Sequence, residues 1–157
     1  MPDAFSFTMR PAILRDLDAL TAIDALCFPP GIAYPREEIA ALLRMRSAIT
    51  LVAERSSVIA GFASLRLLPP RHSSQRGELI TIEVLPEFRR TRIGWQLHQA
   101  LEDWLRAAAG THIELHVAVS NTAAIHFYQR LGYKLIARVP RYYLETIDAW
   151  RMEKTVA

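Results

Sequence analysis

Three polar side chains alternate along one expected strand in the C-terminal half of the chain. His112, Glu114 and His116 lie two residues apart, so they share one face of the expected strand 112–119. Histidine exchanges a proton near neutral pH, which makes either imidazole a candidate general base. A zinc pair is the alternative, but a tetrahedral site needs further ligands that the chain does not obviously supply. We therefore expect no metal, and the residues alone do not separate a base from an ordinary surface or core-lining histidine.

A cluster of arginines lies between an expected strand and an expected helix. The strand 78–84 leads into Arg89-Arg90-Thr91-Arg92-Ile93-Gly94, and the spacing of Leu97, Leu101 and Leu105 predicts a helix directly after this turn. Backbone N–H groups at the start of a helix, helped by arginine side chains, suit a pyrophosphate. A solvated basic turn that happens to precede a helix explains the same residues, so this pattern alone is modest evidence.

The elements that position these groups follow from apolar periodicity and from proline and glycine breaks. Expected strands cover 5–10, 49–54, 58–68, 78–84, 112–119, 133–139 and 149–156, and expected helices cover 17–26, 35–45, 93–109 and 122–131. This order predicts a single α/β domain over residues 1–157, with a mixed central sheet of about seven strands flanked by about four helices.

Several expected boundaries depend on single residues. Asp16 is expected to cap the first helix and Gly110 to end the third, while Ser120 or Asn121 caps the last and Gly132 ends it. Pro69-Pro70 is expected to end the third strand, which leaves 71–77 as an exposed basic loop. On the last helix, periodicity predicts a buried face made of Ala124, Ile125, Phe127 and Leu131.

Composition narrows the class of protein. The chain has 157 residues, of which 51% are hydrophobic and 22% charged, as in a folded globular protein. Its net charge of +3 is scattered, and without a recognition motif we expect no nucleic-acid partner. The lone Cys27 excludes an internal disulfide, and the apolar runs are too short for a membrane span. We expect a soluble, cytoplasmic protein with no membrane partner, either a monomer or a homodimer.

Two segments resemble one known family, the GNAT N-acetyltransferases. In the cofactor signature of that family, Gln or Arg is followed three and five places later by small residues, usually glycine. Arg89 and Gly94 match this signature, whereas Arg92 stands where the first glycine is usual. The segment 115–133 closely resembles the family's Asn-x-x-Ala-Ile-x-Phe-Tyr-x-x-Leu-Gly block. The resemblance is nearest to N-terminal protein acetyltransferases, both the ribosomal-protein-alanine type and the type that acetylates Met-initiated N-termini.

The resemblance implies an acetyl-CoA site and roles for particular residues. It places the donor, acetyl-CoA, at Val84, Arg89, Arg90, Thr91, Arg92, Ile93, Gly94, Trp95, Asn121 and Tyr128. The backbone N–H around Val84 would stabilise the oxyanion where family members open the fourth and fifth strands apart. It also implies that His116 is the base and that Tyr128 protonates the departing thiolate. Glu78 lies where the Met-type enzyme has a Tyr that shares the base role, although an exposed strand-edge carboxylate is an equal alternative.

The acceptor is expected to be a weakly basic amine. Deprotonating an α-amine of pKa about 8 costs about 1.4 kcal/mol at pH 7, against about 4.6 kcal/mol for a lysine of pKa about 10.4. The resemblance implies that the acceptor contacts Phe28, Pro29, Ile32, Tyr34, Tyr142 and Tyr143. The leading hypothesis is therefore an acetyltransferase for a protein or peptide N-terminus. The alternatives are a GNAT enzyme for a small-molecule amine, and a noncatalytic acyl-CoA-binding regulatory protein.

Overall fold

The computed structural model describes residues 6–156 of the chain. Its helices are α1 (Leu17–Cys27), α2 (Arg36–Arg44), α3 (Ile93–Ala107) and α4 (Thr122–Arg130), with short 3-10 turns at η1 (Leu14–Asp16) and η2 (Pro86–Phe88). Its strands are β1 (Thr8–Pro11), β2 (Ala48–Arg55), β3 (Val58–Arg71), β4 (Ser74–Val84), β5 (Gly110–Ala118), β6 (Lys134–Tyr143) and β7 (Ile147–Thr155). Phe5, the first residue of the first expected strand, lies outside the described part.

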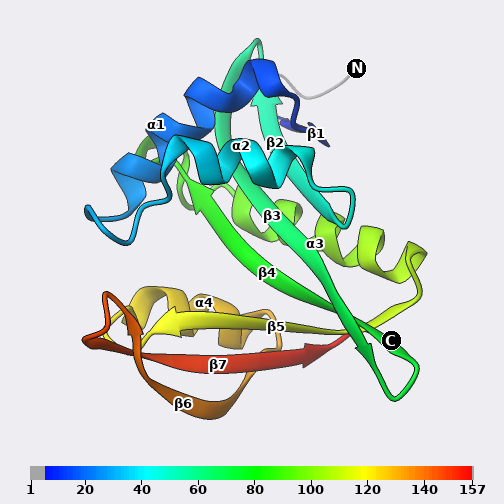
Figure 1. Cartoon of the computed structure of the whole chain (residues 1–157). Coiled ribbons are helices and arrows are strands. Elements are labelled where there is room, and N and C mark those ends of the chain that lie inside the picture. The colour runs from blue at the N-terminus through cyan, green and yellow to red at the C-terminus, as the bar shows by residue number, and fades with distance from the viewer. Residues whose placement is uncertain (1–5, 157) are drawn as a thin grey trace. The chain divides into compact units, whose positions relative to one another are not determined.

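The strands of the described chain form a seven-stranded sheet in the order β1-β2-β3-β4-β5-β7-β6 (Figure 1). β4 and β5 pair in parallel, whereas β1 with β2, β2 with β3, β5 with β7, and β6 with β7 are antiparallel. The predicted mixed α/β fold is thus confirmed. The chain contains two compact units: unit 1 comprises the residues up to Arg66 and Ile80–Trp104, and unit 2 comprises Leu67–Leu79 and the residues from Leu105 onward.

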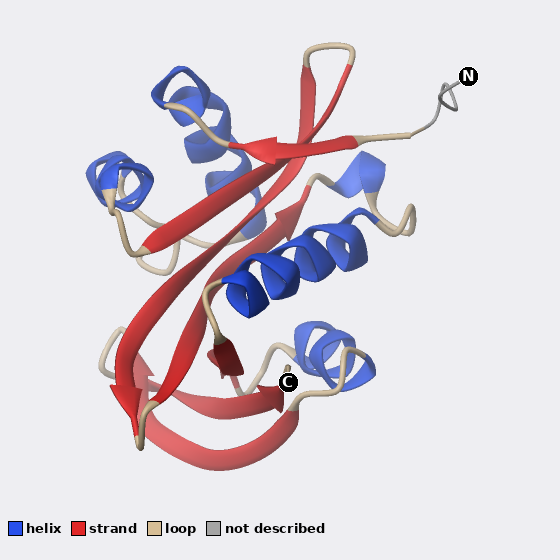
Figure 2. Cartoon of the chain, turned by 90° about the vertical axis from the view of Figure 1, so that its right-hand side faces the viewer, coloured by secondary structure: helices blue, strands red, loops and turns tan. Residues whose placement is uncertain are grey.

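Unit 1 has helices on both faces of its strands. α1 and α2 lie on one face, and α3 lies on the other (Figure 2). The buried cluster on the first face contains Leu17, Leu20, Ile23, Ile39, Ala40, Val52 and Phe62. On the second face, Leu97 and Leu101 are completely buried, because they recur at helical spacing on the inner side of α3. This packing holds the start of α3 beside the end of β4.

Unit 2 is built around β5. Residues Gln75–Glu78 of β4 pair with one edge of β5, β7 pairs with the other edge, and β6 follows β7. Ile113, Leu115 and Val117 are buried, while the residues between them are half-buried. The expected alternation along this strand is therefore confirmed. α4 lies on one face of β5 and β7 (Figure 1).

The expected basic loop at 71–77 is wrong. β3 continues through Pro69-Pro70 to Arg71, and β4 already begins at Ser74. Both prolines are exposed at the far end of the hairpin, where a strand tolerates a missing N–H group. His72 and Ser73 have φ values of 53° and 62°, as expected for a tight two-residue hairpin turn. The arginines of this segment therefore belong to strands.

α1 begins at Leu17, directly after Asp16, as expected, but the expected capping bond of Asp16 and the expected end of α3 at Gly110 are both wrong. Asp16 makes no capping bond to α1; instead its carboxylate accepts the N–H of Ile13 at 2.8 Å and two hydrogen bonds from Arg10 at 2.9 and 3.0 Å. α3 ends at Ala107, and Ala109, with φ of 63°, makes the left-handed turn expected at Gly110. Gly110 is instead the buried first residue of β5, where an added Cβ would lie 2.9 Å from the carbonyl oxygen of Leu105.

The boundaries of α4 agree with expectation, but its burial does not. Asn121 caps the helix, since its side-chain oxygen accepts the N–H of Ala124 at 3.3 Å, and Gly132 ends it with a φ of 100°. The four residues of the expected buried face (124, 125, 127 and 131) are only half-buried. A short helix covered on one side leaves part of each such side chain exposed. No described helix is long and apolar enough to cross a membrane.

Candidate active site

In unit 1, the turn after β4 presents free backbone N–H groups at the start of α3. The first helical bond runs from the N–H of Gln96 to the carbonyl of Arg92 at 2.9 Å. The N–H groups of Ile93, Gly94 and Trp95 therefore have no acceptor within the helix. They combine with the positive end of the helix dipole, an arrangement that can bind an anion such as a pyrophosphate.

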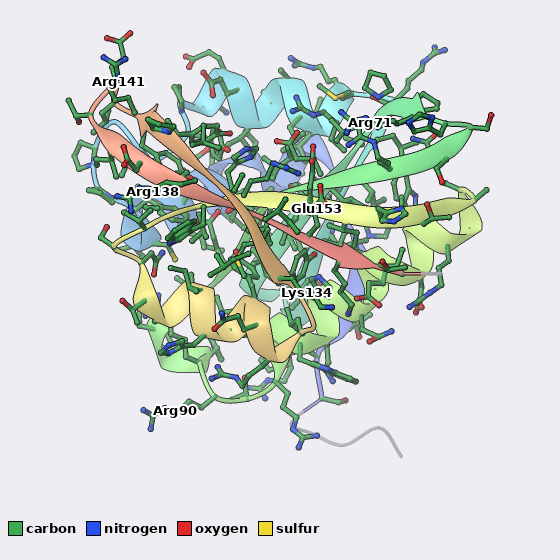
Figure 3. The ribbon with its side chains drawn as sticks, turned by 90° about the horizontal axis from the view of Figure 1, so that it is seen from below. Arg71, Arg90, Lys134, Arg138, Arg141 and Glu153 are labelled. Atoms are coloured by element: carbon green, nitrogen blue, oxygen red, sulfur yellow. The ribbon has the colours of Figure 1, made fainter. Side chains whose placement is uncertain are left out.

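Arg92 adopts the backbone conformation that glycine usually supplies. Arg90 and Arg92 have φ values of 65° and 64°, in the left-handed region, whereas Gly94 does not have a positive φ. This conformation costs a non-glycine residue roughly 1–2 kcal/mol. The turn thus keeps a glycine-like path and gains a cation. Both arginines are exposed, and the side chain of Arg90 extends away from the ribbon (Figure 3).

Arg89 ties the turn to the end of β4. Its Nε donates to the carbonyl oxygen of Val84 at 3.2 Å, and its guanidinium lies 3.9 Å from Sγ of Cys27. Thr91 closes the turn, because its hydroxyl donates to the carbonyl of Phe88. Trp95 is half exposed on the first turn of α3. These contacts stabilise the turn from within unit 1.

Val84 has a backbone N–H that points away from β3. The next N–H, that of Leu85, donates to the carbonyl of Ala60 on β3 at 2.8 Å. Successive N–H groups of a strand point in opposite directions, so that of Val84 is directed away from this neighbour. It can therefore donate to a ligand without breaking the β3–β4 ladder.

The segment 28–34, which includes four of the expected acceptor contacts, follows α1 in unit 1. The N–H groups of Ile32 and Ala33 donate to the carbonyl of Pro29 at 3.1 and 3.0 Å, which closes a tight turn. Phe28 and Ile32 are half-buried, and Pro29 and Tyr34 are exposed. The N–H of Tyr34 donates to Oδ2 of Asp24 at 2.5 Å, so α1 anchors the end of this segment.

In unit 2, His116 is stacked against an aromatic ring. Its imidazole lies 4.4 Å from the ring centre of Tyr142 at an interplanar angle of 7°. The hydroxyl of Tyr143 donates to the carbonyl oxygen of His116 at 3.1 Å. The structure thus brings three of the expected site residues together from β5 and β6. Nδ1 of His116 is buried and has no hydrogen-bond partner among the described residues.

The surroundings of His116 favour its neutral form. Burial lowers the pKa of His116, the charges of Glu78 and Glu114 oppose this shift, and Arg151 adds to it. Glu78 and Glu114 are direct neighbours on the paired strands β4 and β5. A neutral imidazole at pH 7 can accept a proton, which is what a general base requires.

Tyr128 and Asn121 both belong to α4 in unit 2. Tyr128 is half-buried, with its ring 5.7 Å from that of Tyr133 and 5.6 Å from that of Phe127. A phenol in such a position can donate a proton. Asn121 is exposed and uses its side chain for the helix cap. His112 makes a separate contact, a 2.8 Å hydrogen bond between its Nδ1 and the hydroxyl of Thr111.

The donor groups of the described chain do not gather into a metal site. No group of three or more His, Cys, Asp or Glu side chains within residues 6–156 could hold an ion. The polar face of β5 instead contains ion pairs, in which Glu114 lies 3.6 Å from Arg76 and 3.7 Å from Arg151.

Comparison with known proteins assigns the family. Residues 17–133 match the model of the Acetyltransferase (GNAT) family. The chain belongs to this family. The N-alpha-acetyltransferase of Sulfurisphaera tokodaii is 30% identical to this GNAT chain, over 93% of this chain and 91% of the relative. The predicted family membership is therefore confirmed.

Solved structures share the fold of this GNAT chain. The ribosomal-protein-S18-alanine N-acetyltransferase from Escherichia coli superposes with a TM-score of 0.81 at 23% identity, over 96% of this chain and 94% of the other. Arabidopsis thaliana Naa50, in complex with the bisubstrate analogue CoA-Ac-MVNAL, also gives a TM-score of 0.81 at 23% identity, over 95% and 98% of the two chains.

Sequence reasoning missed two groups in this GNAT domain. Arg151 faces His116 from β7, and only the antiparallel register of these strands reveals it. Asp24 and Glu83 are two buried acids in unit 1, with exposed fractions of 0% and 3%. Asp24 follows Leu20 by one helical turn and therefore lies on the buried side of α1. An acid on the apolar face of a helix is the feature of the sequence that could have indicated this buried pair.

Proposed function

We propose that this GNAT enzyme transfers the acetyl group of acetyl-CoA to the α-amine at the N-terminus of a protein or peptide. The observation that carries the proposal is the state of His116, a half-buried imidazole with a lowered pKa, stacked on Tyr142. A neutral imidazole of low basicity matches an α-amine of pKa about 8 better than a lysine of pKa about 10.4. The relationship to an N-alpha-acetyltransferase along most of the chain supports the same acceptor.

Acetyl-CoA would bind at the start of α3. The N–H groups of Ile93, Gly94 and Trp95 would take its pyrophosphate, with Arg90 and Arg92 adding positive charge from the same turn. The N–H of Val84, which points away from β3, would donate to the thioester oxygen as it becomes an oxyanion. These groups belong to unit 1 and keep their geometry through the contacts of Arg89 and Leu85.

The reaction needs one base and one acid. The amine nitrogen attacks the thioester carbonyl carbon, and an imidazole nitrogen of His116 takes the proton that the amine loses. The tetrahedral intermediate then collapses with cleavage of the C–S bond. The departing thiolate takes a proton from the hydroxyl of Tyr128; solvent then returns a proton to Tyr128 and takes up the proton held by His116. The products are the acetylated amine and free CoA, so atoms and charge balance.

Each unit carries residues suited to contact an acceptor. Tyr142 and Tyr143 flank His116 and present aromatic and hydroxyl groups to the first residues of a peptide. The segment 28–34, which carries Phe28, Ile32 and Tyr34, would supply the remaining contacts. In the Naa50 complex the bound ligand joins CoA to a peptide, which supports this kind of acceptor by analogy of fold.

Acetyl transfer can be tested by release of the CoA thiol. We expect turnover with peptides that carry a free N-terminus, and none with the same peptides when the N-terminus is blocked and only a lysine is free. Turnover confined to polyamines, amino acids or other small amines would overturn the N-terminal acceptor in favour of a small-molecule enzyme. If millimolar acetyl-CoA does not change the melting temperature, the assignment of the acetyl-CoA site is wrong. A change in melting temperature without turnover of any amine would indicate a noncatalytic acyl-CoA-binding protein.

The residue roles have a matched control on the same strand. His116→Ala should lower kcat by about 10²-fold or more, since a positioned base contributes that much, while acetyl-CoA binding is retained. Tyr128→Phe should also lower kcat. His112→Ala removes an imidazole from the same face of β5 and should leave kcat within about twofold. Equal rates for the two histidine variants would refute the assignment of the base.

A further inference from the structure

Two carboxyl groups are buried together in unit 1, and the proposed chemistry does not use them. Asp24, on the last turn of α1, has no exposed surface, and Glu83, the residue before Val84 on β4, is 3% exposed. Within the described residues neither carboxyl forms an ion pair with Lys or Arg. Two buried and uncompensated charges would be strongly unfavourable, so the pair requires another explanation.

Each carboxyl has one satisfied and one unsatisfied oxygen. Oε2 of Glu83 accepts the hydroxyl of Thr81 at 2.7 Å, and Oδ2 of Asp24 accepts the N–H of Tyr34 at 2.5 Å. Oδ1 of Asp24 and Oε1 of Glu83 are both buried, and neither has a partner if both groups are ionised. Since the two side chains are hydrogen-bonded to each other, one proton shared between the carboxyl groups would compensate for these missing partners.

The electrostatics agree with one shared proton. Burial, a side-chain hydrogen bond with Asp24 and the charge of Asp24 raise the pKa of Glu83 to about 9, and the hydrogen bond from Thr81 only partly opposes them. At pH 7 Glu83 is therefore neutral and donates to the carboxylate of Asp24. The remaining negative charge strengthens the bond that Asp24 accepts from the N–H of Tyr34.

We propose that Asp24 and Glu83 are positioning residues for the acceptor: by sharing one proton, they hold the segment 28–34 and the end of β4 together. The proposal rests on the proposed function, in which this segment contacts the acceptor and the N–H of Val84 faces the oxyanion. The chain of contacts runs from Thr81 through Glu83 and Asp24 to the backbone of Tyr34. It therefore links a strand of the donor site to the segment of the acceptor site within one unit.

Cys27 and Arg89 are titratable groups near this pair. Sγ of Cys27 lies 3.9 Å from the carbonyl of Val84, and burial, then the charge of Glu83, raise the pKa of Cys27. Arg89 is the nearby cation, and its guanidinium is directed to Val84 and Cys27. When Glu83 loses its proton at alkaline pH, repulsion between the two carboxylates should therefore loosen the anchor of Tyr34.

Glu83→Gln tests this inference, because the amide keeps the shape and the donor of a neutral glutamic acid and cannot ionise. In this variant the peptide KM should change by less than about twofold between pH 7.5 and pH 10, because the amide has no proton to lose in this range. Between pH 8 and pH 10 the peptide KM of the wild type should rise by about tenfold relative to that of the variant, since one unit above its pKa about a tenth of the group stays protonated. Glu38→Gln, which removes an exposed carboxylate of α2, is the matched control and should follow the wild type.

Asp24→Ala tests the anchor itself and should raise the peptide KM with little change in the KM for acetyl-CoA. Unchanged peptide KM in this variant, or an equal pH dependence of wild type and Glu83→Gln, would overturn the inference. Hydrogen exchange at the amide of Tyr34 gives a readout that does not need activity: its protection factor at pH 10 should be at least tenfold lower in the wild type than in Glu83→Gln. Equal protection factors in the wild type and in Glu83→Gln would refute the shared proton, even if the enzyme acetylates peptides. If the protection factors differ as expected but no peptide is acetylated, only the proposed function is refuted.

Discussion

Replacing Glu83 by Gln should remove one component of the pH dependence of folding. In the folded protein the pKa of Glu83 is raised to about 9, mainly by burial, against about 4.3 for an ordinary glutamate. The stability that this group contributes is fully present below the unfolded pKa and is lost as pH rises toward the folded pKa. Between these two values the native state binds one proton more than the unfolded chain, so the free energy of unfolding falls by about 1.4 kcal/mol per pH unit through this group.

Urea unfolding at pH 5.5, 6.5 and 7.5 measures this component directly. The free energy of unfolding of Glu83→Gln minus that of the wild type should grow by about 1.4 kcal/mol per unit, and by about 2.7 kcal/mol over the range. Because all other groups titrate in both proteins, the difference isolates Glu83. Glu38→Gln controls for the loss of an exposed carboxylate and should show no such slope. A difference that stays constant with pH would refute a neutral Glu83 in the folded protein.

Three further outcomes follow from single contacts. Arg92→Gly should change the free energy of unfolding by less than about 1 kcal/mol, because glycine relieves the strain of the left-handed backbone but makes the unfolded chain more flexible. Arg92→Val should lower the free energy of unfolding by about 1–2 kcal/mol, because a branched side chain tolerates this conformation poorly. Equal urea midpoints for the two variants would contradict backbone strain at position 92. Tyr142→Ala should expose His116, raise its pKa and so move the acid limb of the kcat/KM profile to higher pH. Glu78→Gln removes a charge that raises the pKa of His116, so it should move the same limb to lower pH. Shifts in the same direction for both variants would exclude this account of the pKa of His116. Gly61→Ala should cost about 1–3 kcal/mol, since its Cβ would lie 2.5 Å from a carbonyl oxygen of β4, and an unchanged melting temperature would argue against this close approach.

Regular periodicity predicted most helices and strands, and single residues misled at the boundaries. The alternation along β5 and the capping of α4 by Asn121 are local effects, so the sequence is sufficient for them. Pro69-Pro70 failed as a strand end because these prolines lie where no ladder bond is required, and that depends on the pairing of β3. The prediction that Gly110 ends a helix was wrong because a glycine is required there for a different reason: a Cβ at this position would clash with Leu105.

Part of the candidate site could be predicted from the sequence. The motif around Arg89 and Gly94, together with the block 115–133, was sufficient to recognise the GNAT family, because both are contiguous in the chain. Whether Arg92 could replace glycine was not evident from its residue type, and the structure shows that the backbone takes the left-handed path nonetheless.

By itself, the sequence determined the family, the order of the elements and which side of β5 is polar, since these depend on neighbours within a few residues. Only the tertiary structure decided the protonation of the site. His116 is neutral because Tyr142 and the surrounding strands bury it, and Glu83 is neutral because the core buries it and because Asp24, distant in the chain, lies against it. Burial and the distance between charges set a pKa, and both arise from contacts that no local pattern contains.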